Sequence, residues 1–169
     1  MELKEALLKR RSVRKFTDAP VPQECIDELL HAAMSGPSAC NRKPWMFYVV
    51  SNAEVLEALR SATHFSKIEA RLAIVVCGDM KRALPQKLAA YWIQDCSAAT
   101  ENILLRAVDL GLGAVWCGVH PQERAEKNVA EILKLAEAMV PLNIIYLGWP
   151  DEAPEAGDQY EADRVRYIR

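Results

Sequence analysis

The sequence predicts an α+β fold, in the form of a three-layer sandwich of helices and sheet, and three observations support this class. The chain has 169 residues, which is enough for one well-packed domain and short for two. Apolar residues make up 51% of the chain and charged residues 26%, a balance that excludes disorder as the default state. Helical and strand patterns interleave without the strict alternation of a doubly wound sheet.

Charge and hydropathy exclude several other classes of protein. With 21 basic and 23 acidic side chains the net charge is −2, so no overall basic field indicates nucleic acid or a membrane surface. The chain contains no apolar run long enough for a transmembrane span. Its first residues carry charges from position 2 onward and do not resemble a secretory signal. We therefore expect a globular, cytoplasmic protein.

The cysteine pattern argues against disulfides and metal sites. Five cysteines are spread along the chain without a CxxC pair, at Cys25, Cys40, Cys77, Cys96 and Cys117. An odd count without paired spacing is unlike a disulfide scaffold or a zinc site. The three histidines are far apart and form no HExxH motif. The expectation is reduced thiols and no bound metal.

The first half of the chain predicts three helices and two strands. Leucines at helical spacing, followed by cations, predict a helix over residues 2–11, and the same spacing predicts a second over about 26–33. The run WMFYVV at 45–50 is aromatic and β-branched, which is typical of a strand, and a third helix is expected at 55–59. The continuously apolar run LAIVVC at 72–77 predicts a buried strand.

The longest predicted helix, about residues 86–110, is apolar on nearly every face. A helix with this pattern is buried on all sides. In a domain of this size the pattern fits either a central core helix or a helix packed against another subunit. The residues alone leave both explanations open.

Shorter elements complete the chain. A strand is expected at 114–117, a helix at about 122–135 and a last strand at 142–147. Residues 151–163 then contain six acidic side chains and no basic one. A segment of this kind packs poorly on itself, so we expect it to lie across a surface or a partner.

The densest chemical signal is the segment KRRSVRK at 9–15, with five cations in seven residues. Arginine forks together with a hydroxyl at a helix end can bind a phosphate, because each guanidinium offers two parallel donors. Arg10, Ser12 and Arg14 alternate, so an extended segment would present them on one side. The alternatives are a solvated basic turn and a non-specific polyanion patch.

A second candidate is the loop GPSACNRKPW at 36–45, which separates a predicted helix from a predicted strand. Ser38 and Asn41 can hydrogen-bond a ligand, and Trp45 can anchor the end of the loop in the core. Residues of these types also build an ordinary helix-to-strand turn, which is the alternative interpretation.

A third candidate is GLGAVWCG at 111–118. This is not a dinucleotide fingerprint, because Trp116 occupies the place of the third glycine. Gly118, at the end of a buried strand, can let a backbone N–H approach a flat ring. No base is identifiable beside Cys117, so a buried structural thiol is the expected role. Asp95, inside the long apolar helix, is expected to satisfy a local hydrogen bond.

Together, and in this order, the three segments resemble the nitroreductase family of flavin oxidoreductases. The stretches that carry the resemblance are RRSVRKFTDAPVP (10–22), LLHAAMSGPSACNRKPWMFYVV (29–50), ATENILLRAVDLGLGAVWCG (99–118) and PLNIIYLGWP (141–150). Their shared order is far more specific than any single motif. Short members of the family, near this chain in length, are the most similar.

The resemblance implies a single domain, residues 1–169, with a central mixed or antiparallel sheet flanked by helices. It also implies a homodimer with two FMN sites at the subunit interface. The helix at 86–110 would then be the buried dimer helix, which accounts for its apolar faces. The C-terminal tail, 151–169, would pack on the partner subunit.

The resemblance also assigns cofactor-binding residues by position. Contacts to the FMN phosphate fall to Arg10, Arg11 and Ser12, and contact to the pyrimidine edge falls to Arg14. The other subunit would contribute Pro37, Ser38, Ala39 and Asn41. The flavin ring would be lined by Trp116, Cys117 and Gly118, with the Gly118 N–H near the reactive nitrogen.

The implied function is reduction of FMN by NAD(P)H, followed by transfer of electrons to a nitroaromatic, a quinone or a similar acceptor in a ping-pong mechanism. The cofactor carries this chemistry, so no catalytic side chain is predicted. Alternatives are a specialised flavoenzyme such as a dehalogenase, a flavin-free or flavin-weak dimeric binding module, and a polyanion-binding protein.

One departure from the family pattern concerns the tail. Related chains carry basic residues there that complete the phosphate site, and the corresponding positions are Gly157 and Gln159. Arg164 or Arg166 would substitute if the tail were shifted. The sequence therefore predicts FMN binding that is weaker than usual, because charge-assisted contacts contribute roughly 1.5–3 kcal/mol each.

Overall fold

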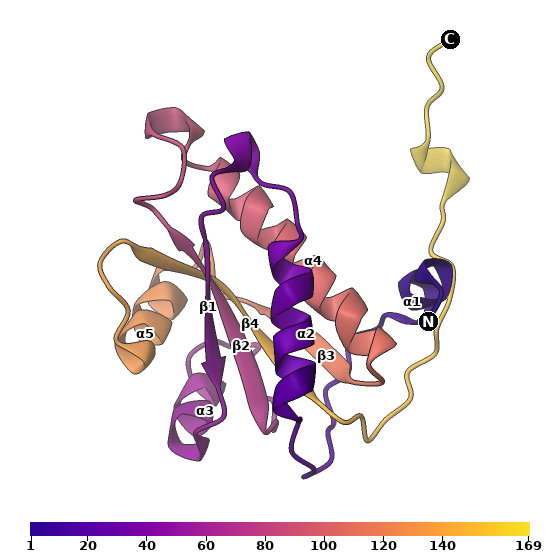
Figure 1. Ribbon diagram of the computed structural model, residues 1–169, viewed down its shortest axis with the longest axis horizontal. Helices are drawn as coiled ribbons and strands as arrows, with labels where there is room; N and C mark the ends of the chain where they lie inside the picture. Colours follow the sequence, from indigo (N-terminus) through magenta and orange to yellow (C-terminus); the bar gives the residue numbers. More distant parts are fainter.

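The computed structural model describes residues 1–169 and contains a four-stranded sheet between two helical layers (Figure 1). The strands are β1 (Trp45–Val50), β2 (Leu72–Asp79), β3 (Gly113–Gly118) and β4 (Met139–Gly148). They lie in the order β1-β2-β4-β3, and every neighbouring pair is antiparallel. The predicted α+β class is confirmed, and the sheet is antiparallel throughout rather than mixed.

Helices cover both faces of the sheet. On one face α2 (Gln23–Met34) and α4 (Tyr91–Asp109) pack together, and on the other lie α3 (Ala53–Arg60) and α5 (Glu123–Leu133). Helix α1 (Leu3–Lys9) packs beside α4. Short 3₁₀ turns occupy Ala39–Asn41, Gln86–Leu88 and Ala162–Arg164. The molecule is therefore a three-layer sandwich, as the sequence predicts.

Strand β2 shows why the apolar run at 72–77 has no polar face. Leu72, Ile74 and Val76 belong to the core beneath α2 and α4, whereas Ala73 and Val75 belong to the core beneath α3 and α5. Alternate side chains of a strand point to opposite faces, so a central strand between two helical layers must be apolar on both. Burying each of the larger side chains contributes roughly 1.5–3 kcal/mol.

Helix α4 is buried on one face only, so the expectation of burial on every side is not met within one chain. Trp92, Ala99 and Ile103 are buried against the sheet. Residues of the opposite face, such as Ala98 and Leu105, are partly exposed. The helix also begins later than predicted, because residues 86–88 form a separate 3₁₀ turn. An apolar, half-covered face of α4 remains available.

The basic segment runs along the outer edge of β3. Ser12 forms a parallel bridge with Ala114, and the N–H of Val13 donates to the carbonyl of Ala114 at 3.0 Å. Gly113 permits this approach, because a Cβ there would lie 2.7 Å from the Val13 side chain. Phe16 then bridges Pro150, just beyond β4. Two motifs that are a hundred residues apart in the sequence are thereby placed side by side.

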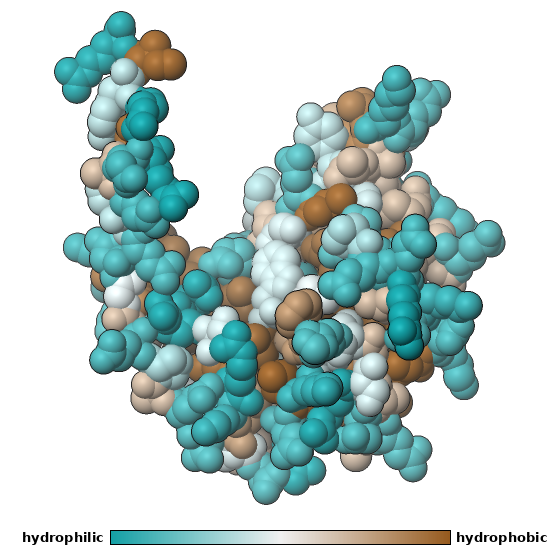
Figure 2. Space-filling view, turned by 180° about the vertical axis from the view of Figure 1, so that it is seen from behind, coloured by the Kyte–Doolittle hydropathy of each residue, from teal (hydrophilic) through white to brown (hydrophobic).

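The C-terminal tail leaves the sheet after Pro150 and passes the basic segment and α1. Figure 1 shows it running past α1 and ending away from the sheet. Figure 2 shows it from the opposite side, standing clear of the body. Tyr160, Tyr167 and Ile168 are exposed along it, Ile168 at 98%. No helix in the structure has both the length and the apolar character needed to cross a membrane.

Candidate functional site

Four predicted phosphate- and ring-binding residues lie together along the outer edge of β3. Arg10 follows the C-terminus of α1, and its Nε lies 3.5 Å from the Glu101 carboxylate on α4. Arg11 and Ser12 are half-buried. Arg14 is exposed, and its guanidinium forms no ion pair. A cationic edge is thus assembled from one extended segment, as the alternation of its residues indicates.

A carboxylate from the tail holds this segment in place. Glu152 Oε1 accepts hydrogen bonds from the backbone N–H groups of Arg14, at 2.6 Å, and Lys15, at 3.3 Å. Hydrogen bonds to a charged acceptor are stronger than neutral ones. The sequence does not predict this role of Glu152, whose only signal is an acidic residue shortly after the last strand.

Two cavities open beside Arg10 and Arg11. One, of about 290 Å³, is also lined by Gly113, Ala114 and Glu152. The other, of about 300 Å³, is lined from the tail by residues 157–160. The two tail positions at which the resemblance expects cations, Gly157 and Gln159, therefore do lie next to the basic segment.

The remaining tail cations lie elsewhere. Arg164 pairs with Glu161 at 2.5 Å, and Arg166 donates to the carbonyl of Asp163 at 2.5 Å. Neither lines the two cavities beside the basic segment. Within one chain, Arg164 and Arg166 therefore do not replace the cations missing at Gly157 and Gln159.

The end of β3 offers an open backbone. The carbonyl of Ala114 faces outward to Val13, and the N–H of Val119 faces inward to Leu142. Because backbone groups alternate in direction along an antiparallel strand, those of Trp116 and Gly118 face outward. A Cβ at Gly118 would meet nothing within 4 Å. A planar ligand can therefore approach this edge and accept a hydrogen bond from the backbone N–H of Gly118.

The side chains next to Gly118 point in different directions. Trp116 is 36% exposed, whereas Cys117 is 3% exposed and belongs to the core beneath α3 and α5. The Cys117 thiol donates to the carbonyl of Phe65 at 3.3 Å. Burial raises the pKa of this thiol to about 11, although the charge of Arg14 opposes the shift. Cys117 is a structural thiol, as expected, and its backbone N–H and carbonyl face inward to β4.

The loop with Pro37, Ser38, Ala39 and Asn41 lies near the start of α4, where the Ala39 N–H donates to Asp95. Figure 1 shows it near the N-terminal end of α4, whereas α1 and the basic segment lie near the C-terminal end. No hydrogen bond or ion pair joins residues 37–41 to residues 10–14 or 116–118. One chain therefore brings the basic segment and β3 together, whereas the loop at 37–41 remains separate from both.

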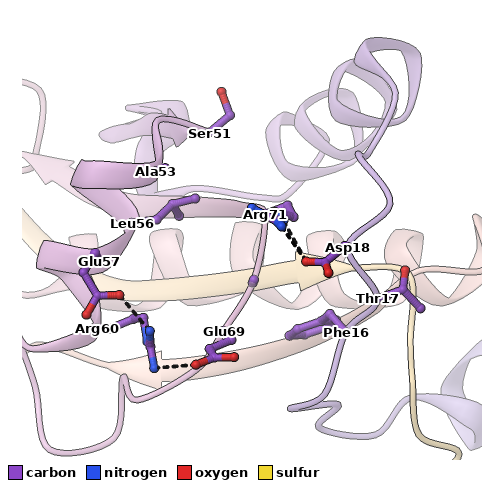
Figure 3. Close-up of a pocket in the computed structure, with 11 residues that line it drawn as sticks. Phe16, Thr17, Asp18, Ser51, Ala53, Leu56, Glu57, Arg60, Glu69 and Arg71 are labelled. Atoms are coloured by element: carbon purple, nitrogen blue, oxygen red, sulfur yellow. Dashed lines mark hydrogen bonds and ion pairs between the residues drawn. The ribbon is translucent and has the colours of Figure 1, made fainter.

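A further cavity, of about 400 Å³, lies beneath α3 (Figure 3). Its charged side chains pair with one another: Arg60 with Glu57 at 2.7 Å and with Glu69 at 3.0 Å, and Arg71 with Asp18 at 2.5 Å. Every charged side chain that lines this cavity therefore has an oppositely charged partner within it. No cluster of three or more potential metal ligands occurs in the structure.

Comparison with known proteins identifies relatives over nearly the whole chain. The model of the Nitroreductase family matches residues 7–71 and 63–149. A Methanothermobacter thermautotrophicus protein, provisionally named NADH dehydrogenase/NAD(P)H nitroreductase, is 42% identical over 167 residues, covering 98% of this chain and 86% of that protein. A Parabacteroides distasonis structure with the same provisional name has a TM-score of 0.92 at 37% identity, covering 98% of this chain and 96% of that one.

A third match bears on the cofactor. A provisionally named nitroreductase from Desulfovibrio desulfuricans, solved in complex with FMN, has a TM-score of 0.83 at 26% identity, covering 99% of this chain and 96% of that one. The matches extend across the basic segment, the 36–45 loop and β3 alike. The chain therefore belongs to the nitroreductase family.

Proposed function

We propose that this protein is a homodimeric, FMN-dependent NAD(P)H oxidoreductase. The observation that carries the proposal is the outer edge of β3, where an open backbone at Gly118 lies on the same edge as the cations of residues 10–14. FMN combines a flat ring with a terminal phosphate. The open backbone suits the ring, and the cations suit the phosphate.

The residues present fit FMN. The guanidinium groups of Arg10 and Arg11 and the hydroxyl of Ser12 would hold the phosphate, since arginine forks match phosphate oxygens. Arg14, which is exposed and free of ion pairs, would bind the pyrimidine edge of the ring. Gly118 would let the ring approach its N–H, because no side chain intervenes.

The partner subunit would complete the site. Pro37, Ser38, Ala39 and Asn41 form no hydrogen bond with the basic segment or β3 of their own chain, which favours a role across a dimer interface. The half-covered face of α4 and the exposed apolar residues of the tail supply surface for such a dimer. In this arrangement residues 1–169 form one domain, and residues 151–169 pack on the partner.

The chemistry that FMN supplies when bound is hydride transfer from NAD(P)H and, in a second half-reaction of a ping-pong cycle, electron transfer to a nitroaromatic, quinone or similar acceptor. The names of the relatives, which include NAD(P)H nitroreductases and an FMN complex, support this donor and cofactor. The protein's own part is binding and orientation, with Trp116 and the backbone of Cys117 and Gly118 against the ring.

A specific observation favours weak rather than tight FMN binding. Gly157 and Gln159 lie beside Arg10 and Arg11, and the tail adds no cation to that cavity. Arg10 also has Glu101 as a competing partner at 3.5 Å. We therefore expect a dissociation constant for FMN above the nanomolar range, and a nanomolar value would contradict this expectation.

The test is a visible spectrum of the purified protein, repeated after addition of FMN and gel filtration, with NAD(P)H consumption measured alongside. A flavin spectrum that elutes with a dimer-sized peak and FMN-dependent consumption of NAD(P)H are the expected results. Arg14→Ala should weaken FMN binding by about tenfold or more while leaving the dimer intact, because a charge-assisted contact is lost.

Arg71→Ala provides the matched control. This arginine is also exposed, but it pairs with Asp18 and lines neither of the two cavities beside Arg10 and Arg11. It should leave FMN binding at the wild-type level. Equal FMN occupancy in wild type and Arg14→Ala would show that the site is placed wrongly.

A further inference from the structure

Asp95 is an acidic residue on the buried face of α4, among apolar neighbours. It is 6% exposed, and no ion pair compensates its charge. A carboxylate in such a place is costly unless it accepts hydrogen bonds. Its Oδ1 accepts the backbone N–H of Ala39 at 2.8 Å, from a loop that precedes it by 56 residues.

That bond satisfies a need of the loop. Ala39–Asn41 is a 3₁₀ turn whose N-terminal residue, Ser38, provides no side-chain cap. The first N–H groups of a helical turn have no internal partner and require an acceptor from outside. Asp95 provides this acceptor from α4. The Ser38 hydroxyl is then free to accept the N–H of Lys43, at 2.9 Å.

The loop also needs to be held in shape. Cys40, Asn41 and Lys43 all have positive φ angles, of 50°, 52° and 48°. Residues with side chains adopt this conformation at a cost and keep it only when the surrounding structure imposes it. The bond to Asp95 is the one hydrogen bond that joins residues 38–41 to another element.

The two ends of the loop are fixed independently of Asp95. Gly36 lies against the backbone of α4, where a Cβ would come within 3.4 Å of the Ala99 nitrogen. Beyond the turn, Arg42 Nε donates to the carbonyl of Arg82 at 2.8 Å, and Trp45 is buried. Removal of Asp95 would therefore release the middle of the loop and leave its ends in place.

We propose that Asp95 is a positioning residue for the FMN site: it fixes the turn that presents Ser38 and Asn41, and it touches no ligand itself. The proposal rests on the function proposed above, in which this loop contacts the flavin bound by the partner subunit. Asp95 thereby links α4 to the cofactor site of the other chain.

The test is an FMN titration of wild type, Asp95→Ala and Asp95→Asn, at a temperature well below the unfolding of each variant. Asp95→Ala should bind FMN about tenfold more weakly, because the Ala39 N–H loses its partner. Asp95→Asn keeps a side-chain oxygen at the same position and should restore binding to near the wild-type level. Asp95→Ser, whose shorter side chain does not reach Ala39, replaces Asp95→Ala if that variant does not fold.

Asn102→Ala is the matched control. Asn102 also lies on α4, and its Nδ2 donates to the carbonyl of Ala32 at 3.0 Å, at the end of α2 rather than in the turn. This variant should lower the unfolding temperature and leave the dissociation constant for FMN unchanged. A purely structural role for Asp95 predicts equal effects of Asp95→Ala and Asn102→Ala on FMN binding.

The outcomes separate the two proposals. Wild-type protein that takes up no FMN overturns the proposed function, and this inference with it. Wild type that binds FMN beside an Asp95→Ala variant of equal affinity, or of affinity equal to that of Asn102→Ala, overturns the positioning role alone. Weaker binding in Asp95→Ala that Asp95→Asn restores supports it.

Discussion

Two glycines of β3 show how one residue type serves different needs along a single strand. At Gly113 the missing Cβ makes room for Val13, whose side chain would otherwise lie 2.7 Å away. At Gly118 nothing lies within 4 Å, so no contact inside this chain requires a glycine there. Gly113 therefore contributes to the fold, and Gly118 leaves the outer edge of β3 open.

This difference gives a prediction at the scale of single residues. Gly113→Ala should lower the free energy of unfolding by about 1–3 kcal/mol, because the strand and the basic segment would have to separate. Gly118→Ala should change it by no more than about 0.5 kcal/mol, yet should weaken FMN binding by crowding the ring. Urea denaturation and FMN titration of both variants measure these effects. Unchanged FMN affinity in Gly118→Ala would contradict the proposed place of the ring.

The sequence predicts which segments form the candidate site but not which of their atoms face it. The basic segment and GLGAVWCG were expected to act together, and the bridge between Ser12 and Ala114 places them side by side. The direction of the Cys117 thiol depends on strand register, which composition does not reveal. The roles of Glu152 and Asp95 depend on partners more than fifty residues away, and no local pattern marks such bonds.

At the scale of elements, prediction was most accurate for short, continuous runs of apolar, aromatic or β-branched residues. The runs at 45–50 and 72–77 became β1 and β2, and the wholly apolar β2 lies centrally between two helical layers. The long helix was harder, because its pattern reports an apolar surface without saying what covers it. The structure covers one face of α4 with the sheet and leaves the other half-exposed.

The C-terminal tail gives a testable prediction at the scale of elements. Its last residues, 161–169, form hydrogen bonds only among themselves, so deleting them should leave the fold intact. The deletion should weaken the dimer, because it removes the exposed Tyr167 and Ile168, which we expect to pack on the partner subunit. Sedimentation velocity across a dilution series measures this change. The double variant Tyr167→Ser/Ile168→Ser should reproduce it, and an unaltered dimer in both variants would contradict the proposed role of the tail.

For the whole molecule, buried thiols predict how stability depends on pH. Burial raises the pKa of Cys77 from 9.0 to about 12, so this thiol stays neutral in the folded protein when it would ionise in the unfolded chain. The contribution of this thiol to the free energy of unfolding is therefore fully present below about pH 9 and is lost as the pH rises toward 12. The loss is up to about 1.4 kcal/mol per pH unit for one thiol.

Urea denaturation at pH 8 and pH 10 measures this slope. Cys77→Ala should make it shallower, because one ionising group is removed from the unfolded state. Cys40→Ala is the control, since this thiol is exposed in the folded protein and should leave the slope unchanged. Parallel slopes for Cys77→Ala and wild type would show that another group governs alkaline unfolding.

The attachment of the basic segment also has a consequence for biosynthesis. The backbone partners of residues 12–16 all lie about a hundred residues or more further along the chain: Ala114 in β3, Pro150 after β4, and Glu152 in the tail. Contacts of such long sequence separation form late, and a ribosome releases the N-terminus first. A nascent chain would therefore carry its arginines unplaced until translation is almost finished. If this edge binds FMN as proposed, cofactor capture follows translation, because an incomplete chain has not yet assembled the edge.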